Sequence, residues 1–264
     1  MASERRVAAF RLGVEYDGTG FHGWQVQRSH RTVQGDLEAA LKRLAGEPVR
    51  VTGAGRTDSG CHAAGQVASV TLKTRLDAAG LKTALNALLS PDVRVVEAAE
   101  VSAAFHARFD ATRRAYRYLI EPRASALLAR YAWLRRVRAG VEALNEASRP
   151  LLGEHDFTSF SRQGSDADER PVCTVVRARW KRLHGRMRFD IESDRYLYTM
   201  VRRIVSSVIR AAENGAGAAQ VRAILAGRDR RLAAPPAPAH GLYLMRVKYP
   251  RVGWIPKEPL DVPA

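Results

Sequence analysis

The sequence predicts an α+β protein in which two halves each follow the order β-α-β-β-α-β, the order of the ferredoxin-like fold. Segments that alternate between apolar and polar residues, as strands do, are followed by segments whose apolar residues recur every three or four positions, as in helices. The succession occurs twice along the 264 residues, a length that accommodates one large domain or two small ones.

The first half begins with a strand at 7–16. Thr32 can cap the helix that follows, and Gly46 can end it, because a threonine oxygen accepts from the first turn and glycine tolerates the left-handed cap. The apolar face of this helix consists of Val33, Leu37, Leu41 and Leu44. Strands are expected at 49–54 and 66–72, then a helix at 76–89 that Pro91 stops, and a strand at 92–100.

The second half repeats this pattern. We expect strands at 115–121, 172–183, 186–192 and 241–249, and helices at 138–152, 195–213 and 218–226. A polar segment at 153–171 is too long for a bare connection in a compact domain, so it either contacts RNA or is simply solvated. The predicted division is 7–104, 105–250 and a Pro-rich tail at 251–264.

Composition restricts the function. The net charge of +16 attracts polyanions, and nucleic acid is the expected partner, although part of the arginine excess can reflect the codon bias of a GC-rich genome. Two distant cysteines, Cys61 and Cys173, and seven histidines without ligand spacing predict free thiols and no metal site. Neither a membrane span nor a secretory signal is evident, so we expect a cytoplasmic protein.

The segment Gly53-Ala-Gly-Arg-Thr-Asp-Ser-Gly60 lies between two predicted strands. Its three glycines allow a sharp turn, which would hold the carboxylate of Asp58 near the cation of Arg56. These letters alone equally describe an ordinary hairpin turn. A phosphate-binding P-loop is excluded, because no Gly-Lys-Ser/Thr follows.

Longer motifs decide between these readings. Tyr16-Asp-Gly-Thr-Gly-Phe-His-Gly-Trp-Gln25 and Gly53-Ala-Gly-Arg-Thr-Asp-Ser-Gly-Cys-His-Ala63 resemble the TruA family of tRNA pseudouridine synthases. Shorter matches follow in order: Thr32-Val-Gln-Gly35, Phe105-His-Ala-Arg-Phe109, Tyr116-Arg-Tyr118, His155-Asp-Phe-Thr-Ser-Phe160, Met200-Val-Arg202 and Gly241-Leu-Tyr-Leu244. The resemblance covers about residues 7–250.

The resemblance implies the pseudouridine synthase fold, a largely antiparallel extended sheet with helices on one face. It also implies a homodimer that converts uridine to pseudouridine at positions 38–40 of the tRNA anticodon stem-loop, without a cofactor. Asp58 stands at the family's catalytic position, and an ionised carboxylate can act as nucleophile on the sugar or the base. The sequence does not decide between attack on ribose C1′ and attack on the uracil ring.

Other family roles fall on four residues. Arg56 matches the arginine that helps extrude the target base from its stack. Tyr116 matches the tyrosine that stacks on this base and helps to move the C5 proton, although a buried strand aromatic would look the same. Arg202 matches the arginine that pairs with the catalytic carboxylate. Leu244 belongs to the strand that walls the pocket, where plain core packing explains it equally well.

Two segments match tRNA-contacting segments of the family. In the first, Arg108 would meet phosphate and the phenylalanines would anchor a strand. The second departs from the family's usual basic and hydroxyl-rich run, which puts its contacts in doubt. The segments consist of Phe105, His106, Ala107, Arg108 and Phe109, and of Ala167, Asp168, Glu169, Arg170 and Pro171.

Three alternatives stay open on the sequence. A non-catalytic RNA-binding module would need only the two sheets and the charge, but it gives no use for the catalytic residues. A thiol enzyme would use Cys61 and His62, yet neighbours on a strand point to opposite faces. A synthase of the same family with another target site is the closest competitor.

Overall fold

The computed structural model describes residues 5–162 and 170–250. They form two compact units, of which the first extends to Thr112 and resumes at Leu244, and the second is Arg113–Tyr243. The predicted division at residues 104 and 105 stays a prediction, and the predicted tail at 251–264 lies outside the described residues.

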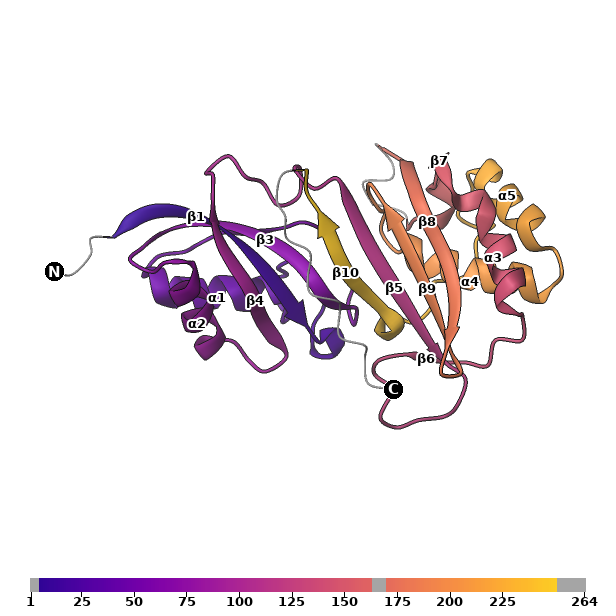
Figure 1. Ribbon diagram of the computed structural model, residues 1–264, viewed down its shortest axis with the longest axis horizontal. Coiled ribbons are helices and arrows are strands. Elements are labelled where there is room, and N and C mark those ends of the chain that lie inside the picture. Colours follow the sequence, from indigo (N-terminus) through magenta and orange to yellow (C-terminus); the bar gives the residue numbers. More distant parts are fainter. Residues whose placement is uncertain (1–4, 163–169, 251–264) are drawn as a thin grey trace. The chain divides into compact units, whose positions relative to one another are not determined.

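The first unit has the predicted order of elements: β1 (Arg6–Tyr16), α1 (Val33–Ala45), β2 (Val51–Gly53), β3 (His62–Thr74), α2 (Ala78–Leu88) and β4 (Val93–Val101). The central strand β1 pairs antiparallel with both β3 and β4. The short β2 pairs with the other edge of β3, and the last strand, β10 (Leu242–Lys248), also follows β3 in the strand order. The arrangement is that of a ferredoxin-like unit, with α1 and α2 beside the strands (Figure 1).

The helix ends of the first unit follow local chemistry. Thr32 Oγ1 accepts from the backbone N–H of Gly35 at 3.2 Å, and Gly46 ends α1 with φ +82°, as predicted. The second helix begins at Ala78 and not near 76, because Asp77 caps it by accepting from Gly80 N at 2.7 Å. The predicted apolar face of α1 is buried except for Leu44, which is half-buried.

The end of β1 is irregular. Its pairing with β3 shifts between Val14 and Tyr16, and its pairing with β4 shifts between Gly13 and Val14. Such shifts bend a strand and redirect the side chains that follow. Here the redirected residue is Tyr16, which begins the first long motif of the sequence.

The second unit contains the predicted strands and helices with two short additions. Its elements are β5 (Arg113–Glu121), β6 (Trp133–Leu134), α3 (Val141–Ser148), β7 (Gly153–Asp156), β8 (Val172–Leu183), β9 (Arg186–Ser193), α4 (Met200–Glu213) and α5 (Gly217–Gly227). The strand order is β5-β9-β8-β7, antiparallel throughout, and β6 adds to β5 in parallel. The predicted α+β class with largely antiparallel strands is therefore confirmed.

One prediction for the second unit was wrong in detail. The helix expected at 195–213 begins at Met200, because Asp194 Oδ1 accepts from Thr174 N at 2.8 Å and from Arg195 N at 2.7 Å and so holds a turn before the helix. The segment at 153–171 is not a bare loop, since it contains β7 and a short 3-10 turn at Thr158–Phe160. Residues 163–169 of this segment lie outside the described residues.

One face of the second sheet forms the core of that unit. Tyr118, Phe189 and Trp180 on β5, β9 and β8 are buried toward the helices, and Trp180 Nε1 donates to Ser148 Oγ of α3 at 3.0 Å. Because side chains alternate along strands, the residues between them form the opposite face. Among the described residues, none of the helices is long and apolar enough to cross a membrane.

Candidate active site

The loop that carries Asp58 joins β2 to β3, as the sequence predicts. Ala54 N donates to Val67 O and Gln66 Nε2 donates to Gly55 O, both at 2.7 Å, which ties the first half of the loop to β3. Cys61 N donates to Asp58 O at 3.1 Å and closes the turn. The Asp58 side chain is half-buried and Arg56 is exposed. The turn is therefore fixed at both ends.

The two long motifs of the sequence lie against each other. Trp24 N donates to Thr57 O at 3.1 Å, and Gly60 N donates to Phe21 O at 3.2 Å. The Ser59 hydroxyl also donates to Phe21 O, at 3.3 Å. Residues 21–24 thus hold the backbone on both sides of Asp58.

Two glycines make this close approach possible. Gly23 has φ +86°, and a Cβ atom there would lie 2.6 Å from Thr57 O, closer than real atoms pack. A Cβ atom on Gly18 would collide with the backbone carbonyl of Cys61. A side chain at either position would push the turn that carries Asp58 away.

A buried pair of hydroxyl groups lies beside Asp58. The hydroxyl of Tyr16 is 2.8 Å from Thr57 Oγ1, and the two residues are only 3% and 8% exposed. Thr57 directly precedes Asp58 in the chain. Tyr16 therefore holds the side chain of Thr57, and Trp24 holds its carbonyl. Both contacts lie one residue before Asp58.

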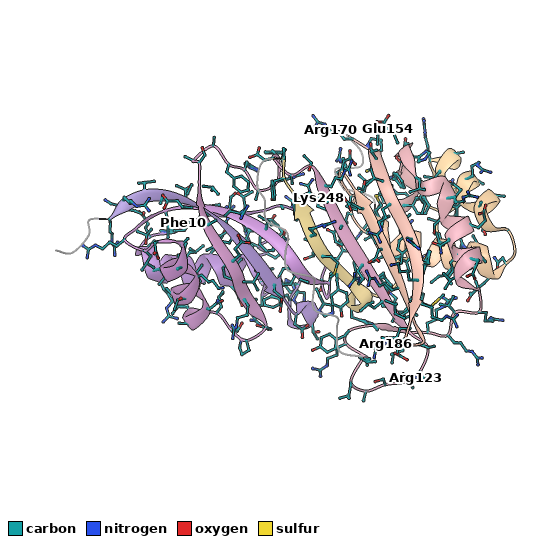
Figure 2. All side chains as sticks on the ribbon, viewed as in Figure 1. Phe10, Arg123, Glu154, Arg170, Arg186 and Lys248 are labelled. Carbon is teal, nitrogen blue, oxygen red and sulfur yellow. The ribbon has the colours of Figure 1, made fainter. Side chains whose placement is uncertain are left out.

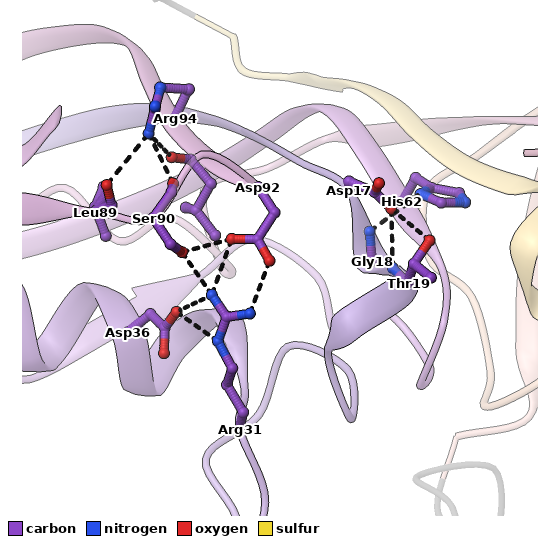
Figure 3. A network of polar contacts seen from close by, with 11 residues as sticks. Asp17, Gly18, Thr19, Arg31, Asp36, His62, Leu89, Ser90, Asp92 and Arg94 are labelled. Atoms are coloured by element: carbon purple, nitrogen blue, oxygen red, sulfur yellow. Dashed lines mark hydrogen bonds and ion pairs between the residues drawn. The ribbon is translucent and has the colours of Figure 1, made fainter. Parts of the chain in front are cut away.

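His62 and Cys61 are buried behind the turn. Figure 3 shows the histidine beside the start of the first motif, where its Nδ1 accepts from Gly18 N at 3.0 Å and lies 3.1 Å from Asp17 Oδ1. Asp17 Oδ1 also accepts from Thr19 N at 3.0 Å. These contacts give His62 a structural role in fastening the first motif.

A second network in Figure 3 fixes the segment before α1. Arg31 donates to Asp92 at 2.7 Å and to Asp36 at 2.7 Å, and its guanidinium lies 4.1 Å from the centre of the Phe21 ring. The hydrogen bond from Arg31 holds the pKa of Asp92 below its usual value. Phe21, whose carbonyl accepts hydrogen bonds from Gly60 N and Ser59 Oγ, is therefore itself held in place by Arg31.

Tyr116 and Arg202 belong to the second unit, whereas Asp58 and Arg56 belong to the first. Tyr116 lies on β5, 7% exposed, with its ring edge-to-face against Tyr196 at 4.9 Å. Desolvation and the neighbouring Tyr116 raise the pKa of Tyr196 well above its ordinary value. The rings of Tyr116 and Tyr196 therefore pack edge to face within this unit.

Arg202 lies in the first turn of α4. Its Nε donates to Ala237 O at 2.7 Å, while Ala237 N donates to Arg202 O at 3.1 Å. The reciprocal pair fastens the Pro-rich segment 234–239 to the helix and fixes the guanidinium. Burial lowers the pKa of nearby His240, and the positive charge of Arg202 lowers it further.

The segment 105–109 is not a strand, and the prediction that its phenylalanines anchor one was wrong. Phe105 packs against Tyr249 with ring centres 5.2 Å apart, but Phe109 is 75% exposed. His106 shapes the turn, because its Nδ1 accepts from the backbone N–H groups of Arg108 and Phe109, each at 3.2 Å, and its ring stacks on Phe109 at 4.3 Å.

Only the small residue of this segment is buried, since Ala107 is enclosed and its carbonyl accepts from the Tyr249 hydroxyl at 2.7 Å. The exposed stack of His106, Phe109 and the Arg108 guanidinium, 5.7 Å from the Phe109 ring centre, is a surface on which a base or a phosphate could rest.

The remaining candidates divide into two groups. Leu244 is fully buried in β10, which agrees with its reading as a core residue. In the second predicted RNA segment, Ala167, Asp168 and Glu169 lie outside the described residues. Arg170 is exposed, and the carbonyl of Pro171 accepts from Phe157 N at 3.0 Å.

Among residues 5–162 and 170–250, the structure has no cluster of three or more histidine, cysteine or acidic side chains arranged to hold a metal ion.

Comparison with known proteins decides the family. A family model described as tRNA pseudouridine synthase matches residues 13–110 and 147–250. This chain belongs to that family. The protein called tRNA pseudouridine synthase A in Chlorobium chlorochromatii is 38% identical over 244 residues, which cover 92% of this chain and 100% of its own. Proteins of the same name from Roseiflexus castenholzii and Agrobacterium fabrum are each 42% identical, over 92% of this chain and 91% and 93% of theirs.

Family membership makes the chain an isomerase that acts on uridine in tRNA. The pair of Tyr16 and Thr57 beside Asp58 was not among the residues expected from the sequence. The sequence does contain a sign of this pair, because Tyr16 begins the first long motif and Thr57 directly precedes Asp58 in the second.

Proposed function

We propose that this synthase converts uridine to pseudouridine at positions 38–40 of the tRNA anticodon stem-loop, with the Asp58 carboxylate as its nucleophile. The observation that supports the proposal is that Phe21 and Trp24 of the first motif fix the turn that carries Asp58, which is itself half-buried. A catalytic group must be held in position before the substrate arrives, because misplacement of about 1 Å can cost roughly 10²-fold in rate.

The reaction breaks the bond between ribose C1′ and uracil N1 and forms a bond between C1′ and C5 of the same uracil. N1 gains a proton and C5 loses one. A carboxylate can form a temporary bond to the sugar or to the ring, which divides one difficult step into two easier ones. In the proposal, Tyr116 stacks on the uracil and helps to move the C5 proton, and Arg202 keeps Asp58 ionised.

A uracil within a stacked stem must leave the stack before it can react. We assign this step to Arg56, whose exposed side chain extends from the same turn as the nucleophile. The exposed stack at His106, Arg108 and Phe109 would contact the RNA beside the target. The resemblance adds a homodimer, which sedimentation velocity would test.

The deciding experiment is Asp58→Asn, which keeps the shape of the side chain but removes its charge. Tritium release from tRNA that carries 5-tritiated uridine should become undetectable, while filter binding of the same tRNA stays within about threefold of wild type. Glu47→Gln is the matched control, because it removes one exposed carboxylate from the same unit. Turnover by the Asp58 variant within tenfold of wild type would overturn the assignment.

The target position needs its own measurement. Chemical modification and primer extension on tRNA from cells with and without the gene would map the affected uridines. Loss of pseudouridine at 38–40 is expected, and loss elsewhere would favour a synthase of this family with a different target.

A further inference from the structure

The second unit has a charged face opposite its core. The core face of its sheet carries Tyr118, Phe189 and Trp180, so the intervening residues point to the other side. The register places Arg177 opposite Glu192, Arg179 opposite Asp190 and Lys181 opposite Arg188 along β8 and β9. Arg117 of β5 extends the second of these rows, opposite Asp190.

The carboxylates on this face are already engaged by other arginines. Asp190 Oδ1 accepts from Arg117 Nε at 3.0 Å, and Asp190 Oδ2 accepts from Arg188 Nε at 2.8 Å. Asp190 is only 7% exposed. Each oxygen is thus paired with an arginine other than Arg179, and among the described residues no ion pair joins Arg179 to the carboxylate directly across from it.

Glu121 repeats this arrangement at the end of β5. It accepts from Arg186 at 2.8 Å and from Arg123 at 3.2 Å, and Figure 2 shows these two arginines at the same end of the unit. Burial opposes the ionisation of Glu121, but the two arginines outweigh it and hold its pKa below the usual value. Glu192 lies 3.9 Å from Arg113.

What is left is a line of three cations on β8, which we call the cationic stripe: Arg177, Arg179 and Lys181. In the part of the chain that the structure describes, none of the three makes an ion pair. Alternate residues of a strand are about 6.6 Å apart, so the stripe is about 13 Å long. That length spans about four phosphates of one nucleic-acid strand at 3.4 Å per phosphate.

The stripe also lies at an accessible place. The neighbouring strand β7 pairs only with residues 172–175 of β8, and the described residues beyond them pair only with β9. Charged residues on such an edge can serve merely to prevent pairing with another sheet. Charges of either sign would serve that role, whereas here three positive charges stand together and the acids across from them lie within ion-pair distance of other arginines.

We infer that the cationic stripe binds the phosphate backbone of tRNA at a part of the molecule remote from the target uridine. This inference rests on the proposed function for the identity of the RNA. Tyr116, proposed to stack on the uracil, points to the core face of β5, and the stripe belongs to the opposite face of the same sheet. One short RNA segment cannot lie against both, so the stripe binds backbone outside the anticodon arm.

The test replaces all three stripe residues by glutamine, as Arg177→Gln, Arg179→Gln and Lys181→Gln together. The control removes the same charge from exposed arginines of the same unit, as Arg149→Gln, Arg182→Gln and Arg222→Gln. Arg182 is on β8 itself, but on the other face. Filter binding of full-length tRNA and of an isolated anticodon stem-loop hairpin is measured from 0.05 to 0.5 M salt, a range chosen to span the regime where counterion release dominates.

Three phosphate contacts, each with a salt slope of about 0.8, predict roughly 100-fold weaker binding of full-length tRNA near 0.1 M salt and a slope reduced by about 2.4. Hairpin binding and the single-turnover rate at saturating enzyme should stay unchanged. The inference is overturned if tRNA binding is unaffected, if the control loses as much, or if the hairpin is affected equally.

Failure of the proposed function would look different. In that case the wild-type enzyme would form no pseudouridine at 38–40, whether or not the stripe variant loses affinity for tRNA.

Discussion

Removing the hydroxyl of Tyr16 should damage catalysis without weakening tRNA binding. Tyr16→Phe keeps the ring that packs 6.2 Å from Trp24 but takes away the 2.8 Å contact with Thr57 Oγ1. A buried hydroxyl that loses its partner costs about 1–3 kcal/mol, and the 8% exposure of Thr57 leaves little access to water. We expect a loss of about 2 kcal/mol in unfolding free energy and a 10- to 100-fold lower kcat, because the residue before Asp58 is no longer held.

The KM for tRNA should not change, since affinity rests on phosphate contacts that this substitution leaves alone. Tritium release measures kcat and KM, and equilibrium urea unfolding measures stability. Thr57→Val combined with Tyr16→Phe removes both hydroxyls and should recover most of the stability but not the rate, whereas Thr57→Ser should keep both. Tyr198→Phe, at an exposed tyrosine, is the stability control. A Tyr16→Phe enzyme with wild-type kcat and stability would refute the reasoning.

Three further predictions concern other parts of the site. Arg202→Met should abolish turnover and, because Asp58 is only half-buried, destabilise the protein by about 1 kcal/mol; adding Asp58→Asn should restore the stability but not the turnover. Simple additivity of the two effects in urea unfolding would argue against the pairing. Cys61→Ser or a chelator should leave tritium release unchanged, and a large loss in either case would revive the thiol or metal alternative. Because burial lowers the pKa of His240 from 6.5, the unfolded chain takes up the proton first as pH falls, so stability should drop below about pH 6.5 and be level above it. His240→Gln should flatten that dependence between pH 5.5 and 7.5, and an unchanged pH profile would contradict it.

The sequence predicted best those elements whose limits are set by neighbouring residues. The first helix begins after Thr32 and ends at Gly46 because a side-chain oxygen caps one end and a left-handed glycine the other, and both are visible in the letters. The start of α4 was misplaced by five residues, because Asp194 bonds to Thr174, which is twenty positions away in the chain. Periodicity cannot show a bond of that kind.

The candidate site divides in the same way. Motif resemblance identified Asp58, Arg56 and the RNA segment at 105–109, since these residues stand next to one another in recognisable strings. It gave Phe109 the wrong surroundings, because burial depends on which segments pack nearby, and this ring stays 75% exposed although His106 stacks on it.

By itself, then, the sequence determined the class of fold and the net positive charge, because both follow from residue type and local spacing, and its motifs resemble a family in which Asp58 stands at the catalytic position. The tertiary structure decided how Thr57 is held. Its hydroxyl contacts Tyr16, which directly follows a shift in the register between β1 and β3. The tertiary structure also decided which cations of the second unit are available to RNA. Asp190 lies across from Arg179 but accepts hydrogen bonds from Arg117 and Arg188. These partners depend on how strands that are distant in the chain are placed side by side.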